Sequence, residues 1–269
     1  MSGHWVGGAV RAKSLAGRRI GSGAAREIAA SPTLAAALAA LADSAYGSRV
    51  HTDHDLAQAQ HGVWATLLWH LRVVAGWQPP AGAAITRVLA GGFQIANAGA
   101  GPRYQLGGLG RRYGWNDGPP LGRRLGWARA VTATVPAAAG WALGAAAILV
   151  ATRVFLVRQP LTEHEHRQAR SLLATEIGGD WADFARRLPA PARWPLADIE
   201  QPSDLWRAER AWWHRVERDG FRLLRDARFG PDPLVGAIGV LTVDAWRVQA
   251  ALEVAARGGV DLETFDALV

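Results

Sequence analysis

Apolar residues recur at spacings of three and four along most of this chain, and the alternating apolar–polar runs of β-strands do not appear. The clearest case lies between residues 53 and 75, where the spacing joins Val63, Trp64, Leu67, Leu68, Leu71 and Val74. On a helix these positions share one broad face, which has to be buried against other helices. The chain is therefore predicted to be all-α, a multi-helix bundle, with internally repeated helical subdomains as one arrangement.

Cap residues and prolines mark where the predicted helices begin. The expected N-caps are Ser31, Asp53 or Asp55, Ser203, Asp232 and Asp261, with Pro32 and Pro233 at the first helical position. The helix that begins at Asp232-Pro233 is expected to end at Gly258-Gly259, because glycine is common just past a helix C-terminus. Within that helix, Asp244 and Arg247 have the i, i+3 spacing of an ion pair.

Residues 98–122 are the weakest stretch of the chain for regular structure. They are rich in glycine and contain Pro102, Pro119 and Pro120, a composition typical of turns and loops. A length of 269 residues allows one large domain or two smaller ones. We therefore expect an N-terminal helical domain at residues 1–97, a linker at 98–122 and a C-terminal helical domain at 123–269.

Residues 131–152 carry no charge, and this run is long enough to cross a bilayer. However, alanine and glycine dominate it and Pro136 interrupts it, so a buried core helix is the preferred interpretation. The N-terminus lacks the continuous apolar stretch of a secretory signal. The expected location is therefore cytoplasmic, and peripheral association with the cytoplasmic face of a membrane is left open.

The charge and the cysteine count narrow the classes of function. Cysteine is absent, which excludes a disulfide scaffold, a thiolate zinc site and a cysteine nucleophile. A formal charge of +7 is typical of proteins that bind nucleic acid or anionic membranes. Lys13 is the sole lysine, however, and Ala, Gly and Arg dominate the chain. This bias is typical of a GC-rich coding sequence more than of a surface selected to bind phosphate. Since no groove-reading or base-stacking module is recognisable, nucleic acid is not an expected partner.

Histidines and carboxylates cluster at residues 51–55 and at residues 164–166, but neither cluster predicts a site. The first stands at a helix start, where acids are expected in any case. In the second, alternate residues of a helix point about 200° apart and cannot converge on one ion. No serine lies in a nucleophile elbow. We therefore predict no catalytic residue, no cofactor, no metal and no small-molecule substrate, and the chain is not expected to be an enzyme.

The segment from Leu205 to Asp219 is the most distinctive part of the sequence. Its apolar stripe, expected to be core, consists of Leu205, Ala208, Trp212 and Val216. Tryptophans flank this stripe and arginines lie opposite it, and both residue types are frequent anchors of protein interfaces. The predicted interface residues are Trp206, Arg207, Arg210, Trp213 and Arg218. The alternative is that the arginines form only a solvated face.

Three segments resemble one known family, and they occur in the family's order. The first is LAALADSAYG, which ends in Tyr46-Gly47; the second is Phe93 to Asn97; the third runs from Trp246 through Arg257-Gly258 to Leu268. They are similar to the C (d) subunits of V-type and archaeal A-type ATPases, with this chain as a divergent bacterial relative. The chain departs from the family in its glycine-rich middle and in Ala98-Gly99-Ala100.

The resemblance implies an all-helical, funnel-like body of three similar bundles that links the membrane rotor ring to the central stalk in proton transport. It implies no catalytic residues, and its expected partners are the subunits of the ring and the stalk. Three other classes stay open: a free-standing helical scaffold or regulator, an enzyme with a pocket that cannot be recognised from residue spacing, and a nucleic-acid-binding protein.

Overall fold

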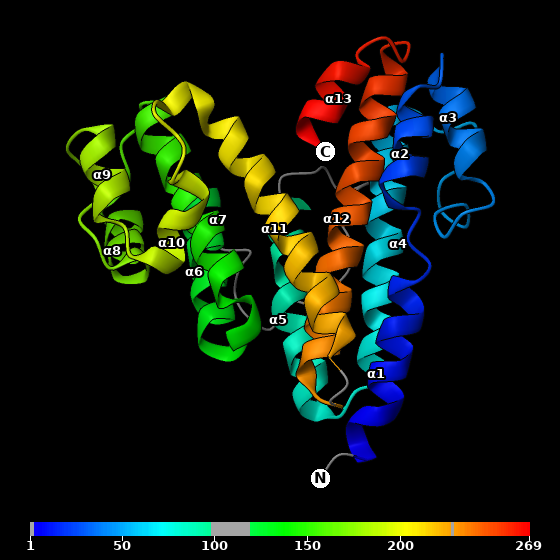
Figure 1. Cartoon of the computed structure of the whole chain (residues 1–269), viewed down its shortest axis with the longest axis horizontal. Coiled ribbons are helices and arrows are strands. Elements are labelled where there is room, and N and C mark those ends of the chain that lie inside the picture. The colour runs from blue at the N-terminus through cyan, green and yellow to red at the C-terminus, as the bar shows by residue number, and fades with distance from the viewer. Residues whose placement is uncertain (1–2, 98–118, 227–228) are drawn as a thin grey trace.

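The computed structural model describes residues 3–97, 119–226 and 229–269, and in these ranges it contains helices and no strand. The structure is 76% helical, which confirms the predicted all-α multi-helix bundle. Figure 1 shows two lobes set side by side in a V, with one long helix, α11 (Leu205–Arg225), passing from one lobe to the other.

The larger lobe is called the α12 lobe, after the helix at its centre. Besides α12 (Pro231–Ala256) it contains α1 (Gly3–Ala16), α2 (Gly21–Ala29), α3 (Leu34–Leu41), α4 (Leu56–Gly76), α5 (Pro80–Asn97) and α13 (Leu262–Leu268). Helix α12 packs against α1, α2, α3, α4, α5, α11 and α13. For this reason every residue of α12 from Pro233 to Ala245 is buried, and so are half of those that follow up to Ala255.

The smaller lobe is called the α7 lobe. Its helices are α6 (Pro120–Thr134), α7 (Ala139–Ala151), α8 (Glu163–Leu173), α9 (Trp181–Arg187) and α10 (Ala190–Arg193), with a π-helical segment at Thr152–Leu156. Helix α7 lies inside this lobe, in contact with α6, α8 and α10. Contacts of α5 with α6 and of α11 with α7 join the two lobes.

The predicted helix starts are confirmed at two positions. Asp55 caps α4, and its carboxylate accepts from the backbone N–H of Gln58 while the Gln58 side chain accepts from Asp55 N–H. Asp261 caps α13 by accepting from Thr264 N–H at 3.2 Å. The predicted end of α12 is also confirmed, because Gly258 and Gly259 follow it with φ of 93° and 67°, a backbone that favours glycine.

Three predicted caps are wrong. Thr33 caps α3 in place of Ser31, and its hydroxyl accepts from Ala36 N–H. Ser203 caps nothing because Pro202–Asp204 form a 3-10 turn ahead of α11. Helix α12 begins at Pro231, earlier than the predicted Asp232-Pro233 cap, and Gly230 stands at its N-cap. Thr33 and Gly230 have the extended backbone of an N-cap, so the helices begin directly after them.

The predicted division at residues 98–122 stays a prediction, because residues 98–118 lie outside the described part of the chain. Two neighbouring facts bear on it. Helix α6 begins at Pro120, inside the predicted linker. Helix α12, in the predicted C-terminal domain, packs against α1, α2 and α4 of the predicted N-terminal domain, so the two are not separate bodies.

The uncharged run at residues 131–152 is not the single core helix that was predicted. Helix α6 ends at Thr134, and the 3-10 turn Pro136–Ala138 separates it from α7 because proline lacks the N–H that would continue a helix. By length and composition, two described segments could cross a membrane, Pro136–Leu156 and Pro231–Ala256. In the second, 83% of the most apolar window is buried inside the molecule, as in a core helix.

Candidate functional site

The inner face of α11 carries the predicted stripe. Leu205, Ala208 and Val216 are buried, which confirms them as core. Trp212 is only half-buried, so the expectation that it lies fully in the core is wrong. Its ring packs on the core from the side, and its Nε1–H donates to the carbonyl of Trp141 on α7 at 2.7 Å. This hydrogen bond joins α11 to the α7 lobe although the indole is only half-buried.

The outer face of α11 carries most of the predicted interface residues. Trp206 and Arg207 are exposed, and the Arg207 guanidinium lies 5.3 Å from the Trp206 ring centroid. Arg218 is exposed as well. Arg210 is half-buried, and its Nε–H donates to His214 Nε2 at 3.3 Å. Together they give α11 a cationic outer face with one exposed indole.

Trp213 lies differently from the other predicted interface residues. Its ring stacks on Trp246 of α12 with centroids 4.7 Å apart and planes 14° apart, and it meets Trp212 edge-on. The indole is half-buried, and its Nε1–H has no hydrogen-bond partner among the described residues. Its large aromatic surface therefore joins α11 to α12, a role that spacing within α11 could not reveal.

The predicted pair of Asp244 with Arg247 is replaced by two other sets of contacts. Arg247 is buried and forms a bidentate ion pair with Glu217 of α11, with Nη2 2.6 Å from Oε2. Burial raises the pKa of Glu217, but the hydrogen bond and charge of Arg247 outweigh this and hold that pKa below its ordinary value. The pair ties α11 to α12 through charge in addition to the stacked indoles.

Asp244 is the acceptor at the centre of the α12 lobe. Its carboxylate accepts from Tyr46 Oη–H at 2.9 Å, from Gly21 N–H at 2.8 Å and from Ile20 N–H at 3.2 Å. Burial raises the pKa of Asp244, while these three bonds act to lower it. Burial and the neighbouring carboxylate raise the pKa of Tyr46 well above its ordinary value. The network joins α12 to the α1–α2 turn and to the segment after α3.

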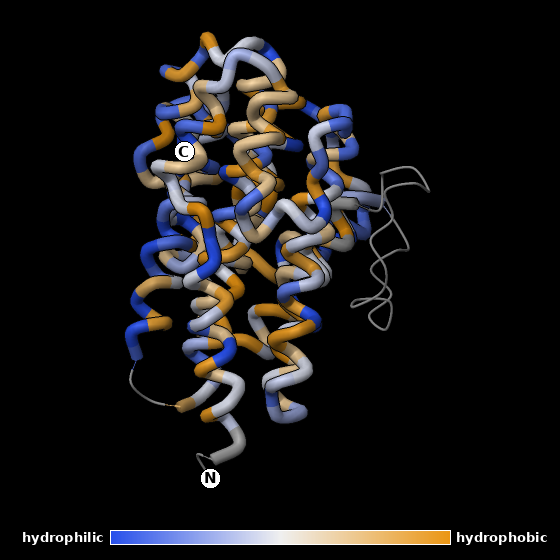
Figure 2. The backbone as a smooth tube through the Cα atoms, turned by 90° about the vertical axis from the view of Figure 1, so that its right-hand side faces the viewer, coloured by the Kyte–Doolittle hydropathy of each residue, from blue (hydrophilic) through white to orange (hydrophobic). Residues whose placement is uncertain are grey.

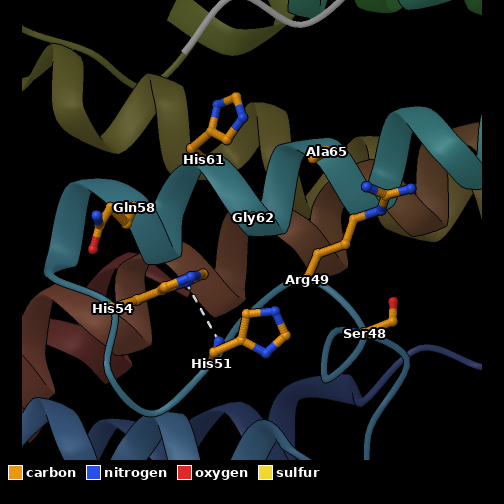
Figure 3. Close-up of a pocket in the computed structure, with 8 residues that line it drawn as sticks. All are labelled: Ser48, Arg49, His51, His54, Gln58, His61, Gly62 and Ala65. Carbon is orange, nitrogen blue, oxygen red and sulfur yellow. Dashed lines mark hydrogen bonds between the residues drawn. The ribbon is translucent and has the colours of Figure 1, made fainter. Parts of the chain in front are cut away.

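A surface cavity of about 560 Å³ opens beside the start of α4, and Figure 3 shows the residues around it. It is lined by Ser48, Arg49, His51, His54, Gln58, His61, Gly62 and Ala65. His51 N–H donates to His54 Nδ1 at 3.3 Å, and the two rings meet edge-on. His61 points away from both of them, on the other side of α4 (Figure 3).

Neither histidine cluster gathers a ligand set for a metal in the described ranges. At residues 51–55, Asp55 is engaged as the cap of α4. At residues 164–166, Glu165 is buried and caps α8 together with Thr162, while His166 Nε2 lies 3.1 Å from the carbonyl oxygen of Ile177. The carboxylates thus stabilise helix starts, as acids near an N-terminus do.

Comparison with known proteins finds no matching family model, no similar curated protein and no similar solved structure. The resemblance to the C (d) subunits of the rotary ATPases therefore depends on the three segments of the sequence alone.

Proposed function

We propose that this protein is a non-catalytic helical adaptor that binds protein partners, in the manner of the C (d) subunit that links the rotor ring of V-type ATPases to the central stalk. The observation that carries the proposal is the outer face of α11, where exposed Trp206 and Arg207 stand on the helix that joins the two lobes. An anchor at that place would bind a partner to the helix that both lobes share.

The position of the resembling segments gives further support. Tyr46 of the first segment donates to Asp244, two residues before Trp246, where the third segment begins. The second segment lies at the end of α5, a helix that packs against α12. Segments distant in sequence are thus collected around one helix, the arrangement expected if they share a structural role.

The arginines of α11 suit an acidic partner. Arg207 and Arg218 are exposed, and each contributes charge that steers association more than it stabilises the fold. Ring and stalk subunits are the proposed partners, with the protein on the cytoplasmic side of the membrane. A free-standing scaffold or regulator would use the same face with a different partner.

The test is affinity capture of the tagged protein from the native cell, followed by mass spectrometry. We expect rotary ATPase subunits to co-purify with the wild type and to be lost from the Arg207→Glu/Arg210→Glu/Arg218→Glu variant. The matched control reverses three exposed arginines of the α7 lobe, Arg167, Arg170 and Arg186. It should retain the partners.

Capture of one defined partner outside the ATPase, lost only from the α11 variant, would favour the scaffold over the ATPase adaptor. Equal retention of partners by all three proteins would contradict any adaptor role for this face of α11.

A further inference from the structure

We propose that one end of the α12 lobe is a membrane-surface site that binds anionic phospholipid headgroups and inserts apolar side chains between them. We call this end the tip. It lies at the bottom of Figure 1, where α1 and α12 begin, α11 ends and α4 passes into α5. Its described residues are Val6, Val10, Trp77 and Phe229, with Arg11, Lys13 and Arg225 beside them. The proposal does not depend on what binds α11.

The tip exposes large apolar side chains from three separate elements. Val10 of α1 is 59% exposed, Trp77 at the end of α4 is 58% exposed and Phe229 before α12 is 48% exposed. Single exposed apolar residues are ordinary, but several gathered at one end of a helical lobe indicate an interaction surface. Trp69, two turns earlier on α4, extends the exposed aromatic surface away from the tip.

Contacts on the two sides of α1 show that these residues form one surface. Lys13 Nζ donates to the carbonyl of Asp226, close in sequence to Phe229, at 3.3 Å. On the other side, the Arg11 guanidinium lies 5.9 Å from the Trp77 ring centroid. At about 100° per residue, Val6 and Val10 project between the directions of Lys13 and Arg11. The apolar surface therefore continues across α1 from Phe229 to Trp77.

The charge around the tip favours an anionic lipid surface as the occupant. Residues 3–26 and 56–97, which include α1, α4 and α5, contain no aspartate and no glutamate. Arg225 ends α11 beside the tip and is exposed. In Figure 2, hydrophilic and hydrophobic residues lie close together at this end of the molecule, near the N-terminus. The nearby acids are Asp226 and Asp232, fewer than the three cations.

Tryptophan and phenylalanine beside lysine and arginine are the side chains that bind the bilayer interface, where the rings reach the acyl boundary and the cations meet phosphate. Each basic residue near such a surface adds to the attraction toward anionic lipid. The aromatic rings and the cations that bind a lipid surface are thus both present at the tip.

The experiment is flotation of the purified full chain with vesicles of phosphatidylcholine, alone or mixed with phosphatidylglycerol. We expect the wild type to float with the mixed vesicles and to be released by added salt, since salt screens the headgroup charge. Trp77→Ser/Phe229→Ser should lower the bound-to-free ratio at least about tenfold, in line with the loss of two apolar anchors. Lys13→Glu/Arg225→Glu should lower it about as much.

The matched controls lie at the far end of α11. Trp206→Ser removes an indole that is 42% exposed, and Arg207→Glu reverses an exposed arginine. Both should float like the wild type, and the melting temperature should show that every variant is folded. Val10→Ser offers a further tip variant if the double change unfolds the chain.

Three outcomes would overturn the proposal. The wild type could stay with the soluble fraction in both kinds of vesicle, or the control variants could lose binding as much as the tip variants. Alternatively, light scattering could show a dimer that Trp77→Ser dissociates while vesicles bind neither form, in which case a second copy covers the tip.

Discussion

Helices α11 and α12 are neighbours of similar length, with 21 and 26 residues. They differ in that α11 carries exposed arginines, whereas α12 carries buried charged residues. On α11, Arg207 and Arg218 are exposed to solvent, and the buried residues form a narrow stripe. On α12 the charges of Asp244 and Arg247 lie inside, and each is matched by groups from other helices. Reversal of the exposed arginines of α11 should therefore affect binding, whereas removal of Asp244 or Arg247 from α12 should affect folding.

The largest effect is expected at Asp244. Asp244→Ala leaves Tyr46 Oη and the N–H groups of Ile20 and Gly21 without their acceptor inside the lobe. The free energy of unfolding should fall by about 4 kcal/mol, as measured by chemical denaturation. Asp244→Asn is the control, since its amide oxygen still accepts from one or two of these donors. An alanine variant as stable as the asparagine variant would refute the central role of the carboxylate.

Trp212→Ala tests the inner face of α11. The change removes a half-buried indole and its hydrogen bond to the Trp141 carbonyl, so stability should fall by about 3 kcal/mol. Thermal unfolding followed by circular dichroism measures the loss. Trp206→Ala, at an exposed position of the same helix, should leave the melting temperature nearly unchanged. Equal losses from the two variants would mean that the two faces of α11 do not differ.

Gly236→Ala tests how closely α11 and α12 approach. A Cβ at Gly236 would lie 2.5 Å from the Gly220 carbonyl oxygen and 2.9 Å from Leu223 Cβ, so the two helices would have to move apart. Overpacking of this kind should cost about 2 kcal/mol in chemical denaturation. Gly126→Ala, inside α6, where a Cβ meets nothing within 4 Å, is the control. A Gly236→Ala protein of wild-type stability would show that the contact is loose.

His70 should make the α12 lobe sensitive to acid. Burial, and then the charges of Arg18, Arg11 and Arg49, lower the pKa of His70 to about 4. Because the unfolded chain binds this proton more tightly, stability is full above about pH 6.5 and is lost as the pH falls toward 4. Between about pH 7 and about pH 5.5 the loss should be about 1 kcal/mol.

Denaturation at several pH values, with the His70→Gln protein as reference, isolates this contribution from those of other groups. If the two proteins lose stability in parallel between about pH 7 and about pH 5.5, His70 is not the group responsible.

The smallest effect is expected on the outer face of α11. Reversal of Arg207, Arg210 and Arg218 to glutamate should change the free energy of unfolding by less than about 0.5 kcal/mol per site, as surface substitutions usually do. The melting temperature should therefore stay close to that of the wild type. A large drop would mean that these arginines stabilise the fold and that the contrast between the two helices is wrong.

The features that depend on the local spacing of residues could be predicted from the sequence. The stripe Leu205, Ala208 and Val216 on α11 and the glycine stop after α12 follow from helical periodicity and backbone geometry. The all-α class follows from the same pattern repeated along the chain. These features need no knowledge of which helices are neighbours.

The rest depends on partners far away in the chain. Tyr46 and Asp244 are 198 positions apart, so no local pattern connects them. The stacking of Trp213 on Trp246 is equally non-local, and the spacing of residues within α11 does not predict it. Helix α1 was not predicted, because glycines interrupt its apolar pattern at Gly3, Gly7 and Gly8.

The central place of α12 also has a consequence during synthesis on the ribosome. Helices α1, α2 and α4 leave the ribosome first, but the helix that covers their apolar faces is made from residues 231–256. At ordinary rates of translation this interval is on the order of ten seconds. Throughout it the nascent chain exposes the surfaces that α12 will bury, a state prone to aggregation. Completion of the fold is thus delayed until nearly the whole chain is available, and the nascent protein is an expected client of chaperones.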